Sequence, residues 1–196
     1  MNHPRRRATL TCLAAGLLTA ALPAVSAAAY PDKPIRLVVP FPPGQGADIL
    51  ARLIGQHLAA ALGQPIVVEN KVGAGGIIGT AFAAKAAPDG YTLYMGSSGP
   101  LAIGPHVYKA VGFDTLKDFA PISNIASVTQ VLVTAPASQL ASAKDVVERA
   151  RAQPGMVPFG SAGSGTTSHL TMELFTQMSG ISLSHVPYKG SSTSMI

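Results

Sequence analysis

The sequence predicts an α/β protein built on mostly parallel sheets. Three short runs, 35–39, 65–69 and 91–95, are rich in β-branched, aromatic or other apolar residues, and each is followed by a loop rich in glycine or serine. Small or apolar residues at helical spacing follow the first two loops. Strands that alternate with helices in this way are typical of parallel sheets, because each connection must cross back over the sheet.

The first strand and helix have clear ends in the sequence. Ile35-Arg-Leu-Val-Val is an apolar run that stops at Pro40, which is typical of a buried strand. Asp48 stands where a helix is expected to begin, and Gly63 is placed to end it. The apolar positions of this helix are Leu50, Leu53, Ile54, Leu58 and Leu62. A second helix of small residues is predicted over 77–87, before the third strand.

The same order of elements restarts near residue 130. Residues 122–128 and 130–134 are rich in β-branched side chains and predict one or two strands. Further helices are predicted over 142–152 and 166–178, and further strands over 157–159 and 181–186. We therefore predict a first α/β domain over 30–128, which is incomplete without a C-terminal return, and a partial second α/β domain over 129–196.

The second predicted domain is short. Residues 189–196 predict a loop and the first residues of a helix, with nothing after them to cover the last strand. A domain of about 65 residues buries too little surface to be more than marginally stable. The sequence therefore predicts a C-terminally truncated chain or a fragment.

Residues 1–29 have the features of a secretory signal peptide. Arg5, Arg6 and Arg7 form a basic start, 10–25 is apolar, and small residues follow at 25–29. The apolar run is shorter than the roughly 20 residues that a membrane-spanning helix needs. We therefore predict that this segment is cleaved and that the protein is exported.

Removal of this segment changes the charge and the redox chemistry. The chain has 14 Lys and Arg against 9 Asp and Glu; without the three arginines it has 11 basic residues and a net charge of about +2. No basic run remains, so nucleic acid is not an expected partner. Cys12 lies in the signal segment, so the mature protein is expected to have no disulfide, cysteine metal site or thiol nucleophile.

Three loops, 43–48, 73–76 and 161–167, combine glycines or hydroxyls with the start of a helix. The first N–H groups of a helix have no intrahelical acceptor, and the helix dipole places partial positive charge there. Such loops bind carboxylate or phosphate, and in parallel sheets they gather at the carboxyl ends of the strands.

The loops differ in how strongly they favour a ligand. In the first, ligand contact and a helix start capped by Asp48 are equally consistent readings. In the second, 73–76, tight turns account for the glycines. Ser97 and Ser98 form a fourth candidate, for which a plain turn serves equally well. In the third, the hydroxyls at the helix start exceed what one helix cap requires, which favours a ligand; they belong to Ser164, Thr166, Thr167 and Ser168.

The common enzyme motifs fail. Residues 160–165 are followed by Thr166 and not by Lys-Ser/Thr, which excludes a P-loop. Ser164 has Ala162 two residues before it, so there is no Gly-x-Ser-x-Gly elbow. Ile78 stands where a dinucleotide fingerprint needs its third glycine. The histidines show no metal-ligand spacing. No enzyme activity, metal or cofactor is therefore expected.

Several short motifs occur in order from about residue 30 to the end. They are Ile35-Arg-Leu-Val-Val-Pro-Phe-Pro-Pro-Gly44, Asp48-Ile-Leu-Ala-Arg52, Val68-Glu-Asn-Lys71, Gly73-Ala-Gly-Gly76, Pro88-Asp-Gly-Tyr-Thr-Leu93, Lys117-Asp-Phe-Ala-Pro-Ile122, Gly163-Ser-Gly-Thr-Thr-Ser-His-Leu170 and His185-Val-Pro-Tyr-Lys-Gly190. Together they resemble the Bug family, the periplasmic solute receptors of tripartite tricarboxylate transporters.

The resemblance implies a type II periplasmic-binding-protein fold with a ligand cleft between two α/β domains. It implies a monomer in the periplasm that binds a small carboxylate and meets the membrane permease subunits of a transporter. Carried over to this sequence, the ligand-binding residues are Gly44, Gly46, Ser97, Ser164, Thr166 and Thr167. Gln45, Ser98 and Ser161, in the same loops, complete the set of residues that we predict to bind the ligand.

The sequence departs from the family at Gln45, where the family commonly has a second glycine. A side chain there changes the pocket, so the ligand stays open. Family members are also longer, which fits a truncated chain.

Two other functions stay open. One is a sensory module that binds the same ligands. The other is an exported hydrolase that uses Ser164 with His169, although a structural role is favoured for His169 because no base-partner pattern accompanies it.

Overall fold

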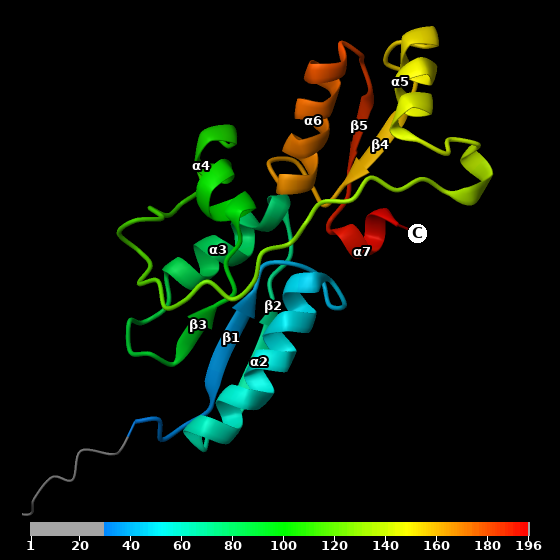
Figure 1. Ribbon diagram of the computed structural model, residues 1–196. Helices are drawn as coiled ribbons and strands as arrows, with labels where there is room; N and C mark the ends of the chain where they lie inside the picture. The colour runs from blue at the N-terminus through cyan, green and yellow to red at the C-terminus, as the bar shows by residue number, and fades with distance from the viewer. Residues whose placement is uncertain (1–29, 196) are drawn as a thin grey trace, which may run out of the picture. The chain divides into compact units, whose positions relative to one another are not determined.

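The structure, a computed structural model, describes residues 30–195. The predicted signal segment, 1–29, and its cysteine therefore lie outside the described residues. Two parallel sheets lie within Lys33–Ile196 (Figure 1). This arrangement confirms the predicted α/β class, while the division at residue 128 stays a prediction.

The first sheet has three parallel strands in the order β2-β1-β3. They are β1 (Ile35–Val39), β2 (Ile66–Asn70) and β3 (Thr92–Tyr94). β1 lies in the centre, where Leu37 pairs with Val68 on one side and with Leu93 on the other. The order places the apolar run at 35–39 in the most buried strand, as its composition predicts.

One face of this sheet is covered by α2 (Gly46–Leu62). Its apolar positions follow helical spacing, so Leu50 and Ile54 share a stripe that packs on Leu37 and Val39 of β1. The helix ends at Gly63, which has φ 70° and donates its N–H to the Ala59 carbonyl. Glycine favours this left-handed position because it has no Cβ.

The opposite face is covered by α3 (Ile77–Ala84). Side chains alternate along a strand, so Val38 and its register partner Tyr94 point away from α2. The Tyr94 hydroxyl lies 2.5 Å from Thr80 Oγ1 on α3. Burial raises the pKa of Tyr94 well above its usual range, so the hydroxyl keeps its proton inside this layer.

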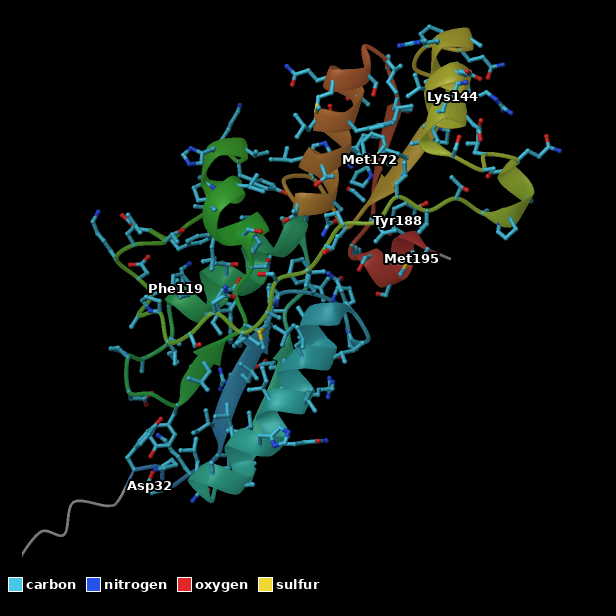
Figure 2. All side chains as sticks on the ribbon, in the orientation of Figure 1. Asp32, Phe119, Lys144, Met172, Tyr188 and Met195 are labelled. Atoms are coloured by element: carbon cyan, nitrogen blue, oxygen red, sulfur yellow. The ribbon has the colours of Figure 1, made fainter. Side chains whose placement is uncertain are left out.

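An aromatic cluster extends this layer beyond β3. Phe119, labelled in Figure 2, has its ring centroid 5.4 Å from that of Tyr94 and 6.1 Å from that of Phe113. Thr115 donates to the Leu101 carbonyl at 2.8 Å and holds the same connector. The connector over residues 109–119 thereby packs against the first sheet, although it contains no helix or strand.

The second sheet pairs β4 (Pro158–Ser161) with β5 (Ser184–Pro187) in parallel. α5 (Ala143–Ala152) precedes it and α6 (Thr167–Ser179) connects its strands. α5 begins with a capping box in which Ser142 and Asp145 each bind the other's backbone N–H. α6 ends at Gly180, whose φ is 61°.

The remaining elements are short. They are η2 (Ala74–Gly76), η3 (Gly99–Ile103), α4 (Gly104–Val107), η4 (Pro136–Ser138) and α7 (Ser191–Ser194). Between residues 30 and 195, no helix has both the length and the apolar character needed to cross a membrane.

The strands predicted over 122–128 and 130–134 are wrong. The segment has no regular structure, and its apolar side chains are exposed, with 82% for Ile122 and 75% for Val131. β-Branched residues favour a strand only where a neighbouring strand supplies hydrogen bonds and packing. No strand described between residues 30 and 195 pairs with this segment.

Two glycines in the helices of the first sheet give a matched stability test. A Cβ at Gly79 would lie 2.6 Å from the Lys71 carbonyl oxygen and 2.8 Å from Pro40 Cα, whereas at Gly55 the nearest atom would be Ile66 Cγ2 at 3.4 Å. We expect Gly79→Ala to lower the free energy of unfolding by about 2 kcal/mol. Gly55→Ala is expected to change it by less than about 1 kcal/mol, because it gains helix propensity. Urea unfolding compares the two, and equal effects would contradict this packing.

Candidate functional site

The strand order defines where a ligand is expected on the first sheet. From the central strand β1 the chain passes to the edge strand β2. From β2 it crosses over β1 to β3, the strand at the opposite edge. In open parallel sheets, ligands bind outside the carboxyl ends of the strands at such a switch point. Gly44, Gly46, Ser97 and Ser98 follow β1 and β3 at this end.

The loop after β1 is held by the buried carboxylate of Asp48, which is 2% exposed. Its Oδ2 accepts from the Gly44 N–H at 2.9 Å and from Arg52 Nε at 2.9 Å, and its Oδ1 accepts from Asn70 Nδ2 at 2.9 Å. The hydrogen bond from Arg52 lowers the pKa of Asp48 to about 2. The carboxylate therefore stays charged and ties β2 and α2 to the loop.

The helix starts two residues before Asp48. Gln45 is the N-cap of α2, and its side chain makes no cap hydrogen bond. Asp48 instead takes the N–H of Gly44, outside the helix. The N–H groups of Gly46 and Ala47, the first two of the helix, have no hydrogen-bond partner within residues 30–195. They are the donors that a helix N-terminus offers to an anion.

Two hydroxyls of the third loop are buried, with Ser161 1% and Thr166 4% exposed. Thr166 Oγ1 donates to the Gly163 carbonyl at 2.6 Å. Ser161 Oγ accepts from the Gly163 N–H at 3.1 Å. In this structure both hydroxyls therefore bond the backbone of their own loop.

Backbone N–H groups that make no hydrogen bond within the described chain lie at the start of α6. Across the described part of the chain, the N–H groups of Thr167 and Ser168 and the hydroxyl of Ser164 have no hydrogen-bond partner. Thr166 caps the helix by accepting from the N–H of His169, at 3.5 Å. The loop after β4 thus ends like the loop after β1, with free N–H groups at the N-terminus of a long helix.

The loops of the two sheets contact each other. Ser98 Oγ lies 3.0 Å from Thr167 Oγ1, so two predicted site residues meet across 69 positions of sequence. Gln45 Oε1 accepts from the Ser191 N–H at 3.2 Å, which links the loop after β1 to the segment after β5. The structure therefore brings residues of the first, third and fourth predicted loops to contacts between the two sheets.

The second loop, for which a turn was favoured, also lies at this contact. Gly75 has φ 62°, as a turn requires, but a Cβ on Gly163 would lie only 3.2 Å from Gly75 Cα. Tyr108 donates its hydroxyl to the Ser164 carbonyl at 2.8 Å, and burial raises its pKa. Sequence reasoning missed Tyr108 and Ser191, because neither belongs to a motif with a known chemistry.

The serine–histidine pair proposed for a hydrolase is not formed. His169 Nδ1 accepts from the Gly165 N–H at 3.2 Å, and its Nε2 lies 3.5 Å from Glu173 Oε1. Ser161 Oγ instead lies 2.7 Å from His185 Nε2, but that hydroxyl is buried. In the described part of the chain, no group of three or more His, Cys, Asp or Glu side chains is arranged to hold a metal ion.

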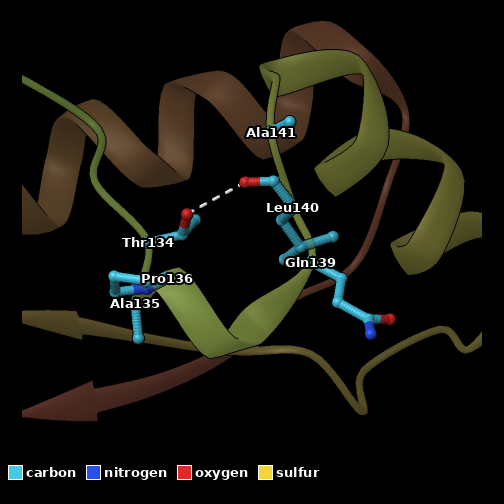
Figure 3. Close-up of a pocket in the computed structure, with 6 residues that line it drawn as sticks. All are labelled: Thr134, Ala135, Pro136, Gln139, Leu140 and Ala141. Carbon is cyan, nitrogen blue, oxygen red and sulfur yellow. Dashed lines mark hydrogen bonds between the residues drawn. The ribbon is translucent and has the colours of Figure 1, made fainter.

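A surface hollow lies elsewhere in the molecule (Figure 3). Thr134 Oγ1 donates there to the Leu140 carbonyl at 2.9 Å. Six residues between 134 and 141 line the hollow: Thr134, Ala135, Pro136, Gln139, Leu140 and Ala141. None of the predicted ligand-binding residues lines it. Its lining side chains carry no charge.

Parallel sheets with anion-type loops at the carboxyl ends of their strands occur in many α/β proteins, and solute receptors of the periplasmic-binding-protein class are among them. Residues 50–196 match the family described as "Tripartite tricarboxylate transporter family receptor". The chain is 43% identical over 173 residues to Protein BugT of Bordetella pertussis, which covers 88% of this chain and 53% of that protein. The chain belongs to this receptor family, and it spans about half the length of the curated relatives it matches.

Solved structures agree with this assignment. A structure described as a periplasmic transporter matches with a TM-score of 0.81 and 43% identity, over 85% of this chain and 56% of that one. An R. palustris protein with adipate matches with a TM-score of 0.82 and 37% identity over the same shares. MatC of Rhodopseudomonas palustris with bound malate matches with a TM-score of 0.73 and 27% identity, again over 85% and 56%. The periplasmic-binding-protein-like fold is thereby confirmed.

The Asp48 network has a consequence for stability. The pKa of Asp48 falls from 3.8 to about 2 on folding, so its charged form stabilises the folded state by about 2 kcal/mol. Because the folded-state pKa is lowered, this contribution is complete above pH 3.8 and is lost as the pH falls to about 2. We expect Asp48→Asn to lower the free energy of unfolding at pH 7 and to have a smaller effect near pH 2. Chemical unfolding at both pH values checks this, and an equal effect at both would contradict it.

Proposed function

We propose that this chain is the ligand-binding part of an exported solute receptor that captures a small carboxylate in the periplasm. It would deliver the ligand to the membrane permease subunits of a tripartite tricarboxylate-type transporter. One observation carries the proposal: the N-termini of α2 and α6 present free N–H groups on loops that belong to contacting ends of two sheets. Membership of the receptor family supports it.

The chemistry of these groups suits a carboxylate. Its oxygens accept hydrogen bonds from backbone N–H groups, and each helix N-terminus adds a partial charge of about +0.5. The free hydroxyl of Ser164, and that of Ser97, which also has no partner among residues 30–195, can add hydrogen bonds. Adipate and malate, bound in two solved relatives, are both dicarboxylates. A ligand held by fixed backbone donors without a nucleophile is bound and released, and we propose no turnover.

Gln45 is the residue of this site most suited to set ligand choice. It is the N-cap of α2, next to the free donors, and its amide oxygen occupies the Ser191 N–H. A Cβ on Gly190 would lie 2.5 Å from that oxygen, so the side chain fits closely against the second sheet's loop. A glycine at position 45 would leave both the Ser191 N–H and this space to a ligand.

Calorimetry on the full chain tests the proposal. The panel holds malate, adipate, citrate, glutamate and benzoate, with adipamide as the uncharged control for adipate. We expect at least one carboxylate to bind with a Kd in the micromolar range or tighter, on the order of −8 kcal/mol. Adipamide is expected not to bind, and no ligand is expected to be chemically changed after incubation. A folded chain that binds nothing in the panel would refute the proposal.

A proline at position 46 removes one proposed donor without disturbing the helix. Gly46 is the first residue of α2, where proline is favoured, and Gln45 before it has the extended backbone that proline requires (φ −79°, ψ 155°). We expect Gly46→Pro to weaken carboxylate binding about tenfold or more, because a charge-assisted hydrogen bond is lost. Gly46→Ala keeps the N–H, and a Cβ there has no atom within 4 Å. Equal affinities of the two variants would show that this N–H does not bind the ligand.

A further inference from the structure

Three aromatic rings stack behind the loop that follows β4. Phe159 on β4 is the register partner of His185 on β5, and their ring centroids are 4.9 Å apart. His169 from the first turn of α6 stacks on His185 with a centroid distance of 3.9 Å. One ring comes from each of the three elements that meet at the loop. The stack therefore fixes the start of α6 against both strands.

Each imidazole also makes a hydrogen bond into the loop. His185 Nε2 lies 2.7 Å from Ser161 Oγ, and His169 Nδ1 accepts from the Gly165 N–H at 3.2 Å. Ser161 Oγ in turn lies 3.2 Å from the Gly163 carbonyl and 3.1 Å from the Gly163 N–H. The two histidines thereby reach both glycines that flank Ser164.

The Gly163 carbonyl already accepts from Thr166 Oγ1 at 2.6 Å. The Ser161–His185 hydrogen bond therefore forms with either group as the donor, according to the His185 tautomer. His169 accepts at Nδ1, so its proton is on Nε2, which faces Glu173, the charged group on its own helix. Burial, and then the neighbouring His169, lower the pKa of His185 while Glu173 opposes the shift. At neutral pH His185 is therefore uncharged, the form in which its Nε2 can serve as donor or as acceptor to Ser161.

We propose that His169 and His185 are positioning residues of the carboxylate site. His169 accepts the Gly165 N–H directly, and His185 holds the Ser161 hydroxyl, which accepts the Gly163 N–H. Together they keep the shape of the loop. The N–H groups of Thr167 and Ser168 are thereby left free, at fixed positions, for the ligand. This inference rests on the proposed function, and it names the side chains that prepare the second of the two helix N-termini.

Four substitutions separate the hydrogen bonds from the ring stack. His185→Gln keeps an N–H donor within reach of Ser161, and His169→Asn keeps an acceptor for Gly165. His185→Phe and His169→Phe keep an aromatic ring but remove the polar atom. His57→Phe, at an exposed position of α2, is the control for the same substitution elsewhere.

Two measurements on the full chain test the proposal. In the ligand-free protein, amide hydrogen exchange is expected to become faster at Gly163 in His185→Phe and at Gly165 in His169→Phe. The affinities for adipate and malate are expected to fall about tenfold in both phenylalanine variants and to stay within about threefold of wild type in the Gln and Asn variants. His57→Phe is expected to match wild type in both measurements.

Ser161→Ala provides a second route to the same result. It removes the hydroxyl that bonds both His185 and the Gly163 N–H and leaves the ring stack in place, so it is expected to speed exchange at Gly163 as His185→Phe does. This variant keeps the test valid if a histidine variant does not fold.

Several outcomes would overturn the proposal. Phenylalanine variants with wild-type exchange and affinity would show that the hydrogen bonds do not position the loop. Gln and Asn variants that lose as much as the phenylalanine variants would show that the rings act by packing alone. If wild type binds no carboxylate of the calorimetry panel, the proposed function fails, and the exchange measurement still decides whether the histidines hold the loop.

Discussion

The loop after β1 depends on one buried carboxylate. Asp48 is almost fully removed from water, which is costly for a charge unless hydrogen bonds replace those of water. Gly44, Arg52 and Asn70 provide them. The Asp48 carboxylate accepts a hydrogen bond from the Gly44 N–H. This bond holds the turn after β1, and α2 begins two residues later, at Gly46. The free donors at Gly46 and Ala47 are a consequence of that turn.

The second sheet reaches a similar arrangement without a buried charge. Hydroxyls of Ser161 and Thr166 and two imidazoles take up the inward polar groups of its loop. Neutral groups are less costly to bury than ions and leave no competing negative charge beside the helix N-terminus. Both loops thus follow one rule: inward N–H groups are bonded within the protein, and the first N–H groups of the helix stay free.

Local features of the sequence predict much of this fold. Apolar runs locate the strands, and Gly63, Ser142 and Gly180 mark helix ends where the structure has them. Loop composition also identifies the loops that contact each other. It does not reveal whether a hydroxyl points inward: Ser161 and Thr166 were predicted to bind ligand, yet their hydroxyls bond the loop itself. The contact of Ser161 with His185 depends on the register of β4 and β5, which no local pattern specifies. The strands predicted between residues 122 and 134 failed for a related reason, because a strand needs a neighbour that local composition cannot supply.

The most direct test of the account is an NMR titration of the isotopically labelled, assigned full chain with adipate and malate. Hydrogen bonding to a carboxylate shifts amide protons downfield at the donors themselves. We expect saturable downfield shifts to occur together at Gly46, Ala47, Thr167 and Ser168, with the same apparent Kd. Binding whose shifts are confined to the hollow between residues 134 and 141, or that leaves these four amides unchanged, would contradict the account.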